Sequence, residues 1–84
     1  MAERLPYRPN FSAAAAEFII SLPKRRQGLL MSRAYELARY PFIESDYQVV
    51  DSDGRSIEHL LVDGTVFAYV VDHAARLVMI TEIE

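Results

Sequence analysis

The stretch that decides the fold is Arg55-Ser-Ile-Glu-His-Leu-Leu-Val62, Asp63-Gly64, Thr65-Val-Phe-Ala-Tyr-Val-Val71 and, after four residues, Arg76-Leu-Val-Met-Ile-Thr-Glu-Ile83. The three longer runs are rich in β-branched and aromatic residues, which favours strands. Asp-Gly is the strongest short hairpin signal, because a type I′ turn requires positive φ at both central residues. Asp72-His-Ala-Ala75 is short enough for a second hairpin. The sequence therefore predicts a three-stranded antiparallel meander.

Two helices are expected ahead of the meander. The first follows Ser12, which has a suitable side chain for an N-cap, and runs to Leu22 before Pro23 breaks it. The second runs from about Lys24 to Tyr40, because a residue that precedes a proline avoids the α conformation. Their apolar stripes are Ala15, Phe18, Ile19 and Leu22 in the first helix, and Leu30, Ala34 and Leu37 in the second.

The remaining segments are expected to be short strands or connectors. Residues 5–11 look extended, but Pro6 and Pro9 remove two backbone donors, so a strand here is short and lies on an edge. Residues 41–54 form a connector with a short strand at Tyr47–Val50. The prediction is one α+β domain over residues 1–84, with an N-terminal helical hairpin packed on a mainly antiparallel sheet of three to four strands.

Composition excludes several classes of protein. The chain has no cysteine and two histidines, so neither a thiolate metal site nor an ordinary zinc site is expected, and no cofactor is implied. No apolar run reaches the 18 residues of a membrane span, so we expect a soluble cytoplasmic protein without a membrane partner.

The charge of the chain is divided unevenly. Residues 1–43 hold seven Lys and Arg residues against three acids, whereas residues 44–84 hold two Arg residues against nine acids. Nucleic-acid affinity comes largely from phosphate neutralisation. The acidic residues of the C-terminal sheet would therefore repel the phosphates of a nucleic acid, whereas the basic N-terminal helices would not. We expect no direct DNA binding.

Three segments resemble the RelE/ParE toxin superfamily of bacterial toxin–antitoxin pairs. They are Tyr7-Arg-Pro-Asn-Phe-Ser12, Leu22-Pro23, and the pattern Asp53-Gly-Arg…Val62-Asp-Gly…Phe67-Ala-Tyr-Val-Val-Asp72…Val78-Met-Ile80. The resemblance implies that the helices pack on one face of the sheet and that an antitoxin segment binds the other face or its rim. It also implies a cellular target. RelE-like members cut mRNA on the ribosome, and ParE-like members inhibit DNA gyrase.

The sequence offers few groups for RNA cleavage. Attack by a 2′-hydroxyl needs a base, an acid and cations around the phosphate. With no lysine after Lys24, the candidates are Arg55, His59, Tyr69, His73 and Arg76. We therefore favour a ParE-like toxin, or a diverged relative, that acts through protein–protein binding over an enzyme. The alternatives are a ribosome-dependent mRNA endonuclease that uses the Arg and His candidates, and a non-toxic dimeric interaction module on the same scaffold.

Each candidate also has a plain structural interpretation. His59 is expected to be partly buried and to bond a carbonyl group, and His73 to be solvated in a turn. The side chains of Lys24, Arg25 and Arg26 are expected either to point into water or to form a docking patch for an acidic partner.

The apolar residues exceed what one covered face requires. In residues 65–71, Phe67 and Tyr69 point one way while Val66, Ala68 and Val70 point the other. The last run repeats this, with Leu77, Met79 and Ile83 opposite Val78 and Ile80. Because two short helices cover only one face, the other is expected to bind an antitoxin segment, a second copy of the chain or the N-terminal segment. The predicted partner-binding residues are Phe67, Tyr69, Leu77, Met79, Lys24, Arg25 and Arg26, although Phe67 and Tyr69 also fit a core.

Overall fold

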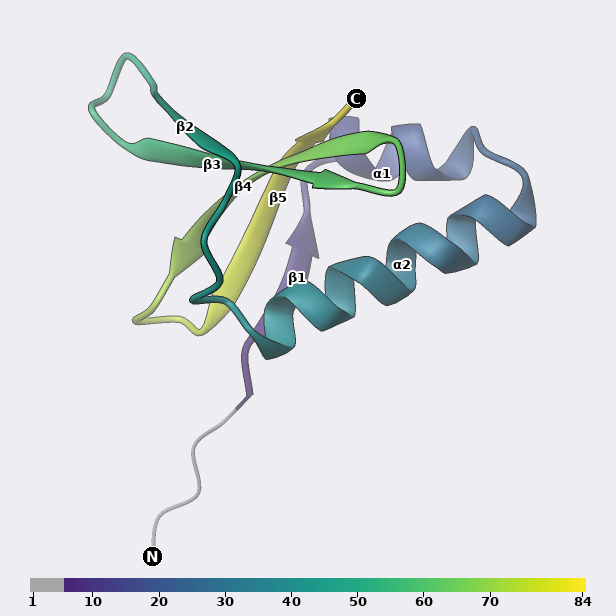
Figure 1. Ribbon diagram of the computed structural model, residues 1–84, viewed down its shortest axis with the longest axis horizontal. Helices are drawn as coiled ribbons and strands as arrows, with labels where there is room; N and C mark the ends of the chain where they lie inside the picture. The colour runs from purple at the N-terminus through teal and green to yellow at the C-terminus, as the bar shows by residue number, and fades with distance from the viewer. Residues whose placement is uncertain (1–5) are drawn as a thin grey trace, which may run out of the picture.

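The sheet is built around the predicted meander. The computed structural model of the protein describes residues 6–84, in which β3 (Ser56–Val62), β4 (Thr65–Asp72) and β5 (Leu77–Ile83) pair antiparallel in sequence order (Figure 1). Asp63 and Gly64 between β3 and β4 have φ values of 47° and 83°. Both values are positive, as the predicted tight hairpin turn requires. The meander and its Asp-Gly turn are therefore confirmed.

Two short strands extend the meander on either side. β2 (Tyr47–Val50) pairs antiparallel with β3, and β1 (Arg8–Phe11) pairs parallel with β5, in the order β1-β5-β4-β3-β2. The sheet thus has five strands and is mixed, so the predicted count of three to four was too low. A parallel neighbour needs a long crossover, which here includes both helices, and its pairing leaves no local signal in the sequence. The N-terminal segment joins the sheet edge, while Leu5 lies outside the described residues.

The helices occupy nearly the predicted ranges. α1 spans Ala13–Ile20 and α2 spans Lys24–Arg39. The Oγ of Ser12 accepts a hydrogen bond from the Ala15 N–H at 3.0 Å, which confirms the N-cap. α1 packs against β5, α2 packs mainly against β1, and the two helices diverge from the turn between them (Figure 1). The two helices and their packing on the sheet agree with the prediction, but their arrangement as a helical hairpin is not confirmed. No helix among residues 6–84 has both the length and the apolarity to span a bilayer.

One hydrophobic core lies between the helices and one face of the sheet. Phe67 pairs with Ile83 and Tyr69 pairs with Ile80, and all four side chains are buried. Ile83 had been predicted to oppose Ile80, but an irregularity between Ala68 and Tyr69 shifts the pairing register by one residue and turns Ile83 toward the helices. The buried core consists of Ala15, Ile19, Leu30, Ala34, Leu37, Ala38, Val62, Phe67, Tyr69, Val78, Ile80 and Ile83.

Asp63 joins the β3–β4 turn to α2. The Nε of Arg33 donates to the Asp63 carboxylate at 2.7 Å, and the Nη2 of Arg26 donates to the Asp63 carbonyl at 3.0 Å. Arg33 also pairs with Glu36, and the two carboxylates, Asp63 first, raise the pKa of Arg33 above its ordinary value. Arg26 therefore contributes to the tertiary structure, whereas Lys24 and Arg25 are exposed.

Two glycines provide a matched test of the turn. Gly64 has a φ of 83°, and a Cβ built on it would meet no atom within 4 Å, so Gly64→Ala should cost only backbone energy of about 1–2 kcal/mol. Gly28 lies inside α2 with equally open space, so Gly28→Ala should stabilise the fold by about 0.5–1 kcal/mol. Urea unfolding measures both changes in the free energy of unfolding. If Gly64→Ala left this free energy unchanged, the left-handed conformation of the turn would be contradicted.

Candidate functional site

The face of the sheet opposite the helices is mainly apolar along β2, β3 and β4. The pairing register aligns His59 with Ala68, Leu61 with Val66, and Val70 with Met79, all on the side away from Phe67 and Tyr69. We call the apolar part of this surface the open face; it comprises Tyr47, Val49, Ile57, His59, Leu61, Val66, Ala68, Val70, Leu77 and Met79. The same side of the sheet also carries Arg8, Asn10, Asp72 and Glu82. Within residues 6–84, the core cluster formed with the helices includes none of these side chains.

The open face is most accessible at its β2–β3 end. Leu61 retains 65% of its surface exposed, and Tyr47 retains 52%. Exposure falls toward the centre, where Ala68 is buried and Val66 and Val70 are half-buried. Exposed apolar side chains gathered on one surface make it a candidate interaction site.

His59 is part of this surface. Its ring stacks on the ring of Tyr47, with centroids 4.5 Å apart and planes 11° apart. Its Nδ1 lies 3.1 Å from the carbonyl oxygen of Ile57. The expectation that His59 is partly buried and satisfied by a carbonyl is therefore confirmed.

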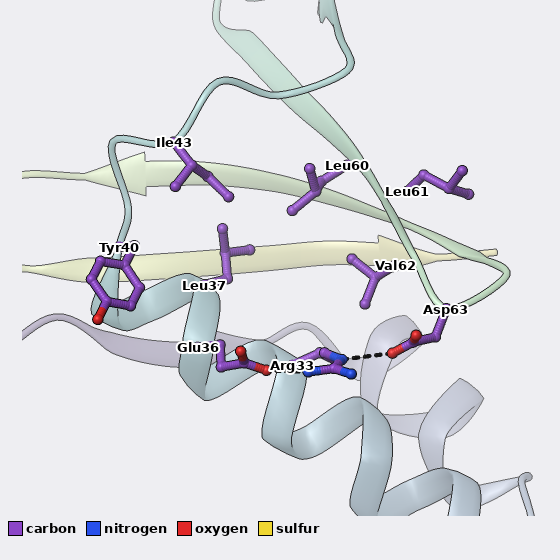
Figure 2. A pocket seen from close by; sticks show the side chains of 9 residues that line it. All are labelled: Arg33, Glu36, Leu37, Tyr40, Ile43, Leu60, Leu61, Val62 and Asp63. Atoms are coloured by element: carbon purple, nitrogen blue, oxygen red, sulfur yellow. Dashed lines mark hydrogen bonds and ion pairs between the residues drawn. The ribbon is translucent and has the colours of Figure 1, made fainter.

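A groove lies between α2 and β3, next to the open face. Its volume is about 330 Å³ (Figure 2). Leu37, Leu60 and Val62 supply apolar walls, the Arg33–Asp63 ion pair lies at one end, and Tyr40 lies at the other (Figure 2). The groove is lined by Arg33, Glu36, Leu37, Tyr40, Ile43, Leu60, Leu61, Val62 and Asp63. Leu61 borders both surfaces, so the groove extends the open face around the edge of the sheet.

An aromatic cluster lies at the opposite end of the sheet, where β1 begins. The hydroxyl of Tyr7 lies 2.8 Å from Nδ1 of His73. The ring of Phe42 stacks on His73, with centroids 5.2 Å apart and planes 7° apart, and meets Tyr7 edge-on at 5.9 Å. The guanidinium carbon of Arg76 lies 5.8 Å from the centre of the Tyr7 ring. Three segments distant in sequence thus form one cluster.

The four predicted nuclease residues fall into three groups. His73 and Arg76 meet around Tyr7, whereas His59 stacks on Tyr47 on the open face. Arg55 lies in the β2–β3 connection, where its Nε donates to the carboxylate of Asp51 at 3.2 Å. The backbone N–H of Arg55 also donates to this carboxylate at 2.9 Å and is the main reason that the pKa of Asp51 is lowered. Among residues 6–84, no group of three or more His, Asp or Glu side chains is placed to hold a metal ion.

The predicted partner-binding residues also separate. Leu77 and Met79 lie half-buried on the open face, as expected. Phe67 and Tyr69 are fully buried against the helices, so they offer no surface to a partner. The alternation of residues in the sequence could not show which face of the sheet the helices cover, because both faces are apolar along β4. Leu61 was missed, although its place two residues from His59 put it on the same face.

Burial of Tyr69 predicts a loss of stability at high pH. Burial raises the pKa of Tyr69 to about 12, and the carboxylates of Glu58 and Asp46 add to the shift. Above about pH 10 the unfolded chain releases a proton that the folded chain keeps, so this contribution is complete below pH 10 and is lost toward pH 12. The free energy of unfolding, measured in urea, should therefore fall less between about pH 9 and about pH 11 for Tyr69→Phe than for the unaltered chain. Tyr35→Phe, at an exposed tyrosine, should show the full loss.

Comparison with known proteins supports the fold. The chain superposes on the RelE2 toxin in the crystal structure of the toxin–antitoxin complex RelBE2 from Mycobacterium tuberculosis, with a TM-score of 0.78. The match covers 95% of this chain and 98% of the other, at 18% sequence identity. No protein-family profile matches the chain, and no curated protein matches it in sequence. The fold is therefore that of a RelE-like toxin, as the sequence resemblance implied.

Proposed function

We propose that this chain is the toxin component, or a diverged relative, of a type II toxin–antitoxin pair and that it acts by binding proteins. The observation that carries the proposal is the open face together with the groove beside it. Leu61 exposes 65% of its surface at the point where the two meet. An antitoxin segment that lies along the open face and turns into the groove would bury this apolar surface.

The edge strand β2 supports an extended form for that segment. All four residues from Tyr47 to Val50 are exposed, and β3 is their only strand neighbour in the described sheet. An edge strand presents backbone N–H and C=O groups that an added strand can pair with. A second copy of this chain could pair in the same way, and size-exclusion chromatography with and without the antitoxin distinguishes the two occupants.

The dispersal of the candidate catalytic groups favours a ParE-like activity. A general base, a general acid and phosphate-binding cations have to surround one phosphate. Here Arg55 is engaged with Asp51 and His59 with Tyr47 and Ile57, each apart from His73 and Arg76. We therefore favour inhibition of a target such as DNA gyrase through surface contacts.

The mRNA endonuclease is the second candidate, because Tyr7, His73 and Arg76 do come together. Expression of the chain in bacterial cells tests both. A toxin should arrest growth, and the protein encoded beside it should restore growth. A gyrase inhibitor should block DNA supercoiling in vitro and leave translation intact, whereas a nuclease should produce discrete mRNA cuts that Arg76→Ala abolishes. Unimpaired growth with neither effect would leave the non-toxic dimeric module and contradict the toxin proposal.

A further inference from the structure

A small hollow opens on the helix side of the sheet, next to the residues that follow α2. Its volume is about 250 Å³. Glu58 on β3 pairs with Tyr69 on β4, so the two side chains lie next to each other on this side, and both residues line the hollow. Residues 41–43 and His73 line it as well. Among residues 6–84, Glu58 is the only acidic residue of the lining, and no arginine or lysine contributes to it.

Glu58 is half-buried, and its carboxylate has no cationic partner among the residues that the structure describes. Its Oε1 accepts a hydrogen bond from the hydroxyl of Ser45, and its Oε2 accepts one from the Nε2 of Gln48, both at 2.7 Å. Both donors are neutral, so they leave the negative charge uncompensated. A carboxylate can accept about four hydrogen bonds, so two positions remain for a ligand. Because glutamate is rarely buried without a cationic partner, this side chain is a candidate binding group.

The hydroxyl of Tyr69 opens into the same hollow. The residue keeps only 1% of its surface exposed, so it offers no outer surface to a partner. Within residues 6–84 the hydroxyl makes no hydrogen bond, although every fully enclosed side-chain nitrogen or oxygen atom there has a partner. The hydroxyl is therefore not enclosed, and the hollow that Tyr69 lines is where it can meet a ligand. Burial first, and then the carboxylates of Glu58 and Asp46, raise the pKa of this hydroxyl, so both carboxylates lie near it.

We propose that the hollow binds the guanidinium group of an arginine that belongs to the antitoxin segment. The N–H groups of the guanidinium donate to the carboxylate of Glu58 and to the hydroxyl oxygen of Tyr69. Arginine fits better than lysine because its planar group carries five donors in a fixed fork and stacks on aromatic rings such as those of Phe42 and His73. The volume of the hollow is below the range of small-molecule sites, about 300–1,000 Å³, and suits one side chain.

Charge and position indicate that the arginine comes from an extended segment at β2. Residues 44–84 hold two Arg residues against nine acids, so this half of the chain attracts a cation. Gln48 on the edge strand β2 pairs with Glu58, so a strand added to β2 would lie two strand spacings, about 10 Å, from β3. A long side chain directed to the helix side can cross Gln48 and reach the hollow. The inference rests on the proposed docking of an antitoxin segment at β2, and it adds the residue type that the segment must carry.

The isolated site is tested with a model compound. We would titrate the isotope-labelled full chain with N-acetylarginine methylamide and with its citrulline counterpart, and follow the amide signals by NMR. The two compounds have nearly the same shape, but the citrulline compound is neutral. The arginine compound should give saturable shifts at Ser56, Glu58 and Val71, which line the hollow, and should bind at least about fivefold more tightly than the citrulline compound.

Two variants remove one contact each. Glu58→Gln keeps the size of the side chain and removes its charge, so binding of the arginine compound should weaken at least about fivefold. Tyr69→Phe removes only the hydroxyl and should weaken binding about threefold. The matched control is Glu17→Gln, which removes the same charge at an exposed position on α1 and should bind the arginine compound like the unaltered chain. Urea unfolding verifies that all three variants are folded.

Titration with the protein encoded beside this chain separates this inference from the proposed function. Glu58→Gln should weaken that binding about fivefold, and Leu61→Lys should weaken it as well. Normal binding by Glu58→Gln together with weakened binding by Leu61→Lys would overturn the inference and leave the proposed function standing. The inference is also overturned if the arginine and citrulline compounds bind equally, or if Glu58→Gln and Tyr69→Phe both bind the arginine compound normally.

Discussion

Phe67→Ala is expected to remove a large part of the stability of this domain. The side chain is fully buried at the centre of β4, between Leu60 on β3 and Ile83 on β5. Removal of a buried phenylalanine costs about 3–5 kcal/mol through lost burial and the cavity left behind. A chain of 84 residues has a total stability of about 4–13 kcal/mol, so this loss is a large part of the whole. Thermal unfolding should show a midpoint lowered by more than about 10 °C.

The same measurement decides whether Phe67 belongs to the core or to an interface. Phe42→Ala makes the identical chemical change at a ring that is 74% exposed, and it should alter stability by less than about 0.5 kcal/mol. A Phe67→Ala variant that kept its stability but lost its partner would place Phe67 at the interface after all. The structure predicts the opposite, because no surface of Phe67 is available for contact.

Leu61→Lys is expected to weaken binding of the proposed antitoxin strongly while leaving the fold intact. Leu61 is the most exposed aliphatic side chain on the open face and borders the groove. An apolar anchor of this kind contributes about 2 kcal/mol or more to a protein interface, which corresponds to roughly 30-fold in affinity. Because the side chain is largely solvated in the free protein, its replacement should change stability by about 0.5 kcal/mol at most. Calorimetric titration with the protein encoded beside this chain measures the affinity.

Ile20→Lys is the matched control. Ile20 is 71% exposed at the end of α1, a position outside the open face and the groove. The variant introduces the same charge in place of a similar aliphatic side chain, so it should bind the antitoxin normally. Equal losses for the two variants would show that added charge, rather than the open face, controls binding.

Local signals in the sequence were sufficient for most of the fold. The Asp63-Gly64 turn, the Ser12 cap and the stop before Pro41 each depend on a few adjacent residues, and the structure has all three. The parallel pairing of β1 with β5 depends on residues far apart and left no such signal. The register shift in β4–β5 was hidden for a related reason, since it arises where two strands fit together rather than within either one.

The candidate sites were harder to predict than the fold. Period-two alternation showed that both faces of β4 are apolar, but it could not say which face the helices cover. Phe67 and Tyr69 were therefore grouped with Leu77 and Met79, although the structure puts the two pairs on opposite faces. The aromatic cluster was not predicted at all. Tyr7, Phe42 and His73 belong to three separate segments, and only the finished sheet brings them together.

The edge formed by β1 and β5 has a consequence for the protein during its synthesis. Ser12, the residue after β1, donates a hydrogen bond through its hydroxyl to the carbonyl of Thr81, a residue 69 positions later in the chain. A nascent chain cannot close this contact until β5 has left the ribosome, and contacts of such long range form slowly. β1 therefore remains unpaired with β5 until β5 has been synthesised. Until then the backbone groups of β1 that pair with β5 in the folded protein have no partner in the sheet.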